Sequence, residues 1–221
     1  MKLLSEPVLI VRQEWRAYGR PPEYDVFDRR WDQVARARYV DDEEVRSVLA
    51  AFGLRHRTAD ALRTVDPEGR TLFTVVFPGF RARAVMLVQD AEGRHVGEAV
   101  KTKGHLRPRY ELTSAGRPVG AVQVMDRRQR LVSVLDPVGE PVAAIRTGME
   151  GAPFPVPKKS ADGYYLETLR PMPHPLGTLV VAVAVALQAA VGSETRVGET
   201  VAIRLPMIPP ALDRLRRRFR A

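Results

Sequence analysis

Four short stretches decide the fold: Asp66-Pro67-Glu68-Gly69-Arg70, Asp90-Ala91-Glu92-Gly93-Arg94, Thr113-Ser114-Ala115-Gly116-Arg117 and Asp136-Pro137-Val138-Gly139-Glu140. Each has Asp or Thr first, Gly fourth and a polar residue fifth, and the glycines are 24, 23 and 23 residues apart. An Asp or Thr side chain can accept a hydrogen bond from the turn that it opens, and a later Gly adopts positive φ without strain. Each stretch therefore predicts a tight turn, and the even spacing indicates an internal repeat.

Runs of apolar and β-branched residues flank these turns on both sides. The clearest are Leu72–Phe77, Val85–Val88, Val119–Val124, Leu131–Leu135 and Val142–Ile145. A tight turn between two such runs is typical of a β-hairpin. Weaker runs of the same kind lie further out, at 9–13, 24–28, 34–39 and 164–169. Together the runs predict about twelve strands.

The faces of these strands indicate what the sheet encloses. Arg109–Leu112 alternates polar and apolar residues, whereas Leu72–Phe77 is apolar on both faces. This mixture favours a closed antiparallel barrel with another element packed inside it. A β-propeller is the competing architecture, but its blades need about 40 residues, more than this repeat offers.

Two segments depart from the β pattern. Asp41–Glu44 can cap a helix with an apolar stripe that ends at Gly53. Residues 176–191 are apolar on every face, and Pro171–Ser193 contains no charged residue. Sixteen helical residues span roughly 24 Å, less than the ~30 Å hydrocarbon core of a bilayer. We therefore predict a buried helix at the centre of the barrel and keep a transmembrane helix as the alternative.

Composition narrows the class of protein. The chain has 221 residues, no cysteine and a formal net charge of +9. The absence of cysteine excludes disulfide frameworks, cysteine-ligated zinc and thiol catalysis. Glu6 interrupts the apolar start too early for a signal peptide, so a cytoplasmic location is expected. We predict a barrel domain over residues 1–193 and a basic extension over 194–221.

The order of these elements resembles the tubby C-terminal-like superfamily, and within it the phospholipid scramblase and LURP-one-related family. The resemblance is carried by Glu23–Asp28, the turns at Gly69, Gly93 and Gly139, Ala161–Leu166, and the helix 176–191. It covers roughly residues 8–192. It implies a mainly β fold, an about twelve-stranded closed antiparallel barrel around a central C-terminal hydrophobic helix.

The same resemblance implies a non-enzymatic binding or scaffold module that associates with anionic phospholipid. Scramblases of this family are described as calcium-dependent, but only Asp162 corresponds to their acidic residues, so no metal or other cofactor is predicted. Such a module would lie peripherally at the inner membrane face. The first alternative is a membrane-inserted scramblase-like protein with residues 176–191 spanning the bilayer. The second is a nucleic-acid-associated regulator that uses the Arg-rich C-terminus.

Basic residues are the candidate site, because tubby proteins bind phosphoinositide headgroups with basic barrel residues. The candidates for anionic lipid form two local clusters and a C-terminal group: Lys101, Lys103, Arg107 and Arg109; Lys158 and Lys159; Arg214, Arg216, Arg217, Arg218 and Arg220. The chain has no nucleophile elbow, phosphate loop, dinucleotide fingerprint or metal-type histidine spacing. No catalytic residue is therefore predicted. Stacking aromatics are not interleaved with basic residues, which makes nucleic acid the less favoured partner.

Overall fold

The computed structural model describes residues 2–14, 22–40, 43, 60–78, 85–103, 108–125, 131–149, 152–156 and 163–187. Within these ranges the chain forms a short 3-10 helix, η1 (Lys2–Leu4), and twelve strands. The strands are β1 (Val8–Glu14), β2 (Glu23–Asp28), β3 (Gln33–Tyr39), β4 (Asp60–Val65), β5 (Thr71–Phe77), β6 (Val85–Asp90), β7 (His95–Lys103), β8 (Arg109–Ser114), β9 (Arg117–Val124), β10 (Leu131–Leu135), β11 (Pro141–Thr147) and β12 (Tyr164–Thr168).

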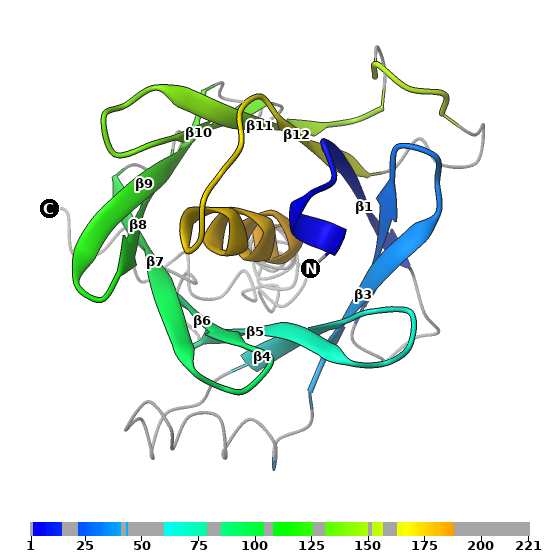
Figure 1. The fold of residues 1–221 in the computed structure, drawn as a ribbon, viewed down its shortest axis with the longest axis horizontal. Coiled ribbons are helices and arrows are strands. Elements are labelled where there is room, and N and C mark those ends of the chain that lie inside the picture. Colours follow the sequence, from blue (N-terminus) through cyan, green and yellow to red (C-terminus); the bar gives the residue numbers. More distant parts are fainter. Residues whose placement is uncertain are drawn as a thin grey trace, which may run out of the picture. The chain divides into compact units, whose positions relative to one another are not determined.

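The strands form a closed antiparallel barrel (Figure 1). Each strand pairs with the next one along the chain, and β12 pairs with β1 to close the ring. Because the ring is closed, each of these twelve strands has a paired neighbour on both sides, and the sheet has no free edge. The predicted mainly β barrel is confirmed.

Three of the four predicted turns have one geometry. In the turn from β4 to β5, the Asp66 amide donates to Arg70 O (2.9 Å) and the Gly69 amide donates to Asp66 O (3.0 Å). The turns at Asp90 and Asp136 repeat both bonds, and the glycine in each has positive φ. Local chemistry alone therefore explains these three hairpins.

The fourth turn differs from its pattern. β8 runs on through Thr113 and Ser114, so only Ala115 and Gly116 connect it to β9. Both have positive φ, 48° and 71°. A two-residue hairpin turn of this kind needs positive φ at both central positions, which leaves Thr113 to the strand.

A helix over residues 176–187 runs through the centre of the ring of strands (Figure 1), and all of its residues are buried. The predicted central helix is confirmed over these residues, while 188–191 lie outside the described ranges. Two wall glycines let it approach closely. A Cβ at Gly97 would lie 3.1 Å from Leu179 Cδ1 and collide with Thr113 O, and one at Gly120 would lie 2.9 Å from Leu176 Cδ1.

Among the described residues, no helix is both long enough and apolar enough to cross a membrane. The helix predicted between Asp41 and Gly53 lies outside the described ranges apart from Glu43. The predicted extension 194–221 lies outside them as well.

A second apolar cluster lies on the outer face of the barrel wall. Ile10 of β1 and Tyr165 of β12 are buried there, and Phe154 from the segment 152–156 packs edge-on against Tyr165 with ring centroids 5.2 Å apart. The indole Nε1 of Trp31 donates to Pro155 O (2.7 Å), which ties this segment to the turn after β2. Burial raises the pKa of the Tyr165 hydroxyl. This cover explains why β1 is apolar on both faces.

Candidate functional site

The structure brings three of the predicted lipid-binding residues together where β7 ends and β8 begins. Lys103 pairs in register with Arg109, and Lys101 pairs with Tyr110 after a bulge in β7. The Arg109 guanidinium donates from Nη1 to Gln123 Oε1 on β9 (3.0 Å). Lys101 and Arg109 are both half-buried. The β7–β8 register therefore places the end of β7 beside Arg109, whereas the sequence grouped these residues only because they lie close along the chain.

The other predicted candidates lie outside the described ranges. They are Arg107, Lys158, Lys159, Arg214, Arg216, Arg217, Arg218 and Arg220. For these residues the prediction stands as the sequence made it.

An exposed apolar side chain accompanies the basic residues. The Val124 amide at the end of β9 donates to Pro108 O (3.0 Å), which brings the end of β9 beside the start of β8. Met125, the next residue, is 45% exposed, a large value for an apolar side chain. Met125 was not among the residues predicted for the site, although the hairpin that brings it beside β8 was predicted.

The net positive charge of the chain lies largely off the strands. The described residues include 15 Lys and Arg against 17 Asp and Glu, so the remaining residues hold 20 basic and 9 acidic side chains. The connections from β1 to β2, from β3 to β4, from β5 to β6 and from β7 to β8 leave the barrel at the end opposite the tight turns. Basic residues of β7 and β8 lie at the same end, because an antiparallel meander alternates its connections between two ends.

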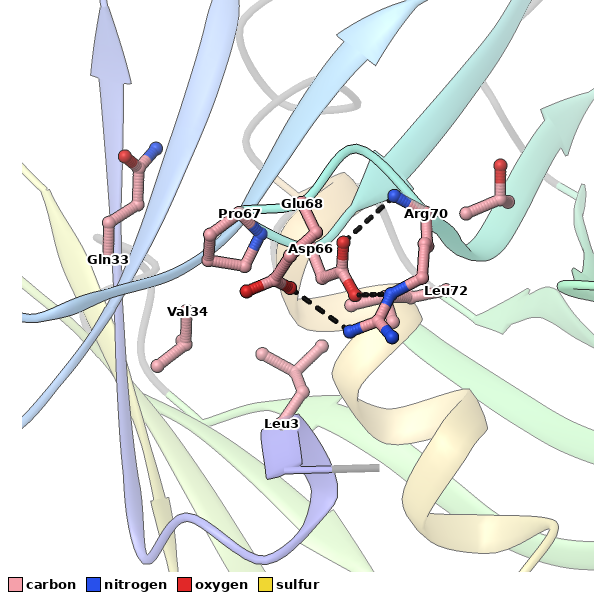
Figure 2. Close-up of a pocket in the computed structure, with 9 residues that line it drawn as sticks. Leu3, Gln33, Val34, Asp66, Pro67, Glu68, Arg70 and Leu72 are labelled. Carbon is pink, nitrogen blue, oxygen red and sulfur yellow. Dashed lines mark hydrogen bonds and ion pairs between the residues drawn. The ribbon is translucent and has the colours of Figure 1, made fainter.

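The opposite end of the barrel carries a pocket of about 510 Å³ (Figure 2). Leu3 of η1, Val34 of β3 and Leu72 of β5 line one side of it. Asp66, Glu68 and Arg70 of the first tight turn line the other, and Gln33, Pro67 and Thr71 complete the lining. The sequence assigned these turn residues to structure alone, since nothing in the local pattern shows that η1 and β3 lie beside them.

The charged side of this pocket is an ion triad. The Arg70 Nε donates to Asp66 Oδ2 (2.7 Å), and Arg70 Nη2 donates to Glu68 Oε2 (3.1 Å). Partial burial raises the pKa of Asp66, but hydrogen bonds from the Arg70 amide and guanidinium outweigh it and hold that pKa below its ordinary value. The same bonds raise the pKa of Arg70. The turn from β6 to β7 repeats the triad with Asp90, Glu92 and Arg94.

Within the described ranges, no group of three or more His, Asp or Glu side chains is arranged to hold a metal ion. The barrel interior is filled by the helix.

Comparison with known proteins gives one structural similarity. The X-ray structure of a protein from Arabidopsis thaliana is similar at a TM-score of 0.47 and 12% sequence identity, over 83% of this chain and 93% of that chain. No protein-family model matches the chain, and no curated protein matches it. The functional conclusions therefore depend on this chain's own residues.

Proposed function

We propose that the protein is a non-enzymatic binding module of the scramblase and LURP-one-related kind, and that it associates with anionic phospholipid. The observation that carries the proposal is the β7–β8 end, where the strand register pairs Lys103 with Arg109 and Lys101 with Tyr110, and where the exposed Met125 follows β9. The set consists of Lys101, Lys103, Arg109 and Met125. We call this set the basic end cluster.

The chemistry of the basic end cluster suits a lipid surface. Each Lys or Arg close to an anionic membrane contributes about 1 kcal/mol of attraction, and that attraction weakens as salt screens it. An exposed apolar side chain among cations can enter the headgroup region. Arg109 is held by Gln123 rather than by a carboxylate, so this contact leaves its charge unneutralised.

The enclosed helix supports the peripheral form of this proposal over the spanning alternative. Residues 176–187 fill the barrel, and Leu179 packs at Gly97 while Leu176 packs at Gly120. A bilayer-spanning helix would have to leave the barrel and expose the apolar inner wall to water. Burial of apolar surface stabilises by about 25 cal/mol per Å², so emptying the barrel would cost more than a domain's whole stability.

Vesicle sedimentation tests the proposal on the full chain. We expect binding to phosphatidylcholine vesicles that contain phosphatidylserine, no binding to phosphatidylcholine alone, and loss of binding as salt rises. The triple variant Lys101→Gln, Lys103→Gln, Arg109→Gln should sediment less at low salt.

A control with the same change in charge comes from the opposite end of the barrel. Arg29, Arg30 and Arg117 are exposed there, and their triple Gln variant should sediment like the parent. Equal losses in the two variants, or no preference for the anionic vesicles, would overturn the proposal. Salt-dependent binding to duplex DNA without vesicle binding would favour the nucleic-acid alternative instead.

A further inference from the structure

We propose that the pocket at the tight-turn end binds a small amphipathic cation, a primary alkylammonium compound, with its chain on the apolar side and its ammonium group at Glu68. This inference is independent of the lipid proposal, which concerns the opposite end of the barrel. It follows from a gap in the barrel wall, from the composition of the lining and from the charge balance of the triad.

The pocket lies where pairing between β3 and β4 stops early. The two strands pair from Tyr39 with Leu62 to Arg36 with Val65, although β3 begins at Gln33. After Val65, the Asp66 amide donates within the turn to Arg70 O, and Pro67 has no amide hydrogen to continue a ladder. The wall therefore opens laterally between the start of β3 and the β4–β5 turn.

The lining of the opening is suited to an alkyl chain. Leu3 is 2% exposed and Val34 is 6% exposed, so they form a preformed apolar surface rather than flexible side chains. Figure 2 shows Leu3 and Val34 facing the same space, with Leu72 beyond them beneath Arg70. A volume of about 510 Å³ lies within the range of small-molecule sites, about 300–1,000 Å³.

The charge balance selects a cation. Both Asp66 carboxylate oxygens accept from Arg70, Oδ1 from the backbone amide (2.8 Å) and Oδ2 from Nε (2.7 Å). Arg70 also donates to Glu68 Oε2, so two carboxylates surround one guanidinium and the triad has a net charge of −1. The Glu68 side chain is 64% exposed, so an incoming donor can reach its carboxylate. An anionic ligand would meet the repulsion of both carboxylates.

The β6–β7 turn provides an internal comparison. Asp90, Glu92 and Arg94 form the same ion triad, with Arg94 Nη2 2.8 Å from Glu92 Oε2. There, however, β5 and β6 pair as far as Phe73 with Asp90, so the wall is closed up to the first residue of the turn. The two turns carry the same three charged side chains, but the pairing beside the β4–β5 turn stops earlier than the pairing beside the β6–β7 turn. Comparing variants of the two turns therefore shows whether binding requires the pocket or only the triad.

Titration of the full chain with hexylammonium, followed by amide chemical shifts, tests the inference. We expect saturable binding with shifts concentrated at Gln33, Thr71 and their neighbours. Hexanoate should not bind, because it carries the wrong charge, and methylammonium should not bind, because it lacks the chain. Glu68→Gln should weaken hexylammonium binding about tenfold, the effect of losing one charge-assisted hydrogen bond.

The matched control is Glu92→Gln, which makes the same change in the triad of the β6–β7 turn, where β5 and β6 pair as far as Asp90. Its affinity for hexylammonium should equal that of the parent. The inference is overturned if both variants weaken binding equally, if hexanoate binds as well as hexylammonium, or if shifts do not saturate. Since vesicle binding is measured separately, any of these results leaves the lipid proposal unaffected.

Discussion

Tyr164 and Tyr165 are neighbours on β12 but their side chains serve opposite faces of the wall. The Tyr164 hydroxyl lies inside the barrel and donates to the backbone carbonyl oxygens of Ala184 and Val185, the latter at 3.2 Å. Tyr165 lies outside, in the apolar cluster with Ile10. A buried hydroxyl needs a hydrogen-bond partner, and here the partners are carbonyl groups of the central helix. Tyr164 therefore links β12 to that helix.

Tyr164→Phe should therefore destabilise the protein by about 0.5–1.5 kcal/mol, because it removes a buried hydrogen bond between β12 and the central helix. The measurement is the free energy of unfolding from urea denaturation. Tyr165→Phe is the matched control, since it removes the same hydroxyl from the outer face and should cost less. Equal losses for the two variants would show that the bonds to Ala184 and Val185 do not hold the helix.

The sequence could predict those conformations that depend on bonds between residues a few positions apart. Asp66 and Gly69 form their turn through bonds to Arg70 and to each other, so spacing was enough to find it. Trp31 (φ 67°) occupies the glycine position of a turn closed by the same two local bonds, from the Asp28 amide to Asp32 O (3.0 Å) and from the Trp31 amide to Asp28 O (3.0 Å). Its indole contact with Pro155 O had no local signal in the sequence. Local bonds can be read from a pattern, whereas contacts over more than a hundred residues cannot.

The central helix determines how the other elements are arranged. Its apolar residues occur on every side, which suits a position enclosed by strands on all sides. The strands contribute Gly97 and Gly120 where the helix comes closest, and larger side chains elsewhere. The helix and the inner face of the barrel therefore form one hydrophobic core, and each buries its apolar surface against the other.

Val183→Asp tests this dependence at the level of the element. Val183 is fully buried in the middle of the helix, so a carboxylate there would be desolvated without a partner. That costs several kcal/mol, comparable to the 5–15 kcal/mol stability of a whole domain. We expect loss of cooperative thermal unfolding, measured by circular dichroism.

Val183→Ile at the same position is the control, because it keeps the side chain apolar and adds only one methylene group. It should retain cooperative unfolding. A Val183→Asp protein that melts like the parent would show that the helix is not part of the core.

The sequence predicts which segments form strands or helices better than it predicts which of these segments lie next to one another. The twelve strands and the helix followed from turn chemistry, apolar runs and hydropathy, each of which is local. The pocket did not, because it needs η1, β3 and the β4–β5 turn at one place, and these contribute residues from Leu3 to Leu72. Its one available signal was the repeated Asp-x-Glu-Gly-Arg pattern, which occurs equally in a turn that has no opening.

At the scale of the whole molecule, the described barrel is close to neutral while the chain is strongly basic. Fifteen basic and 17 acidic residues lie in the described ranges, against a net charge of +9 for the chain. The wall balances its charges through pairs such as Arg36 Nε with the buried Asp25 (2.8 Å). That hydrogen bond and charge raise the pKa of Arg36. The described residues as a whole therefore add no net attraction to an anionic surface beyond that of local groups such as the basic end cluster, and the excess positive charge belongs to the rest of the chain.

The C-terminal group of arginines is a dense group of basic residues within that rest of the chain. Residues 208–221 contain five Arg and one Asp, so truncation after Met207 lowers the formal net charge from +9 to +5. Leu212, Leu215 and Phe219 have the spacing of one apolar helix edge, which suits insertion at an interface. At about 1 kcal/mol per cation, losing this group would weaken membrane association by several powers of ten.

Truncation after Met207 should therefore abolish sedimentation with phosphatidylserine or cardiolipin vesicles at low salt. The melting temperature should not change, because every described residue is retained. A full-length variant with Leu212→Ser, Leu215→Ser and Phe219→Ser separates the two contributions, since it keeps the charge and removes the apolar edge. If the truncated protein sediments like the parent, the tail does not anchor the protein, and attraction must come from the basic end cluster and from Lys158 and Lys159.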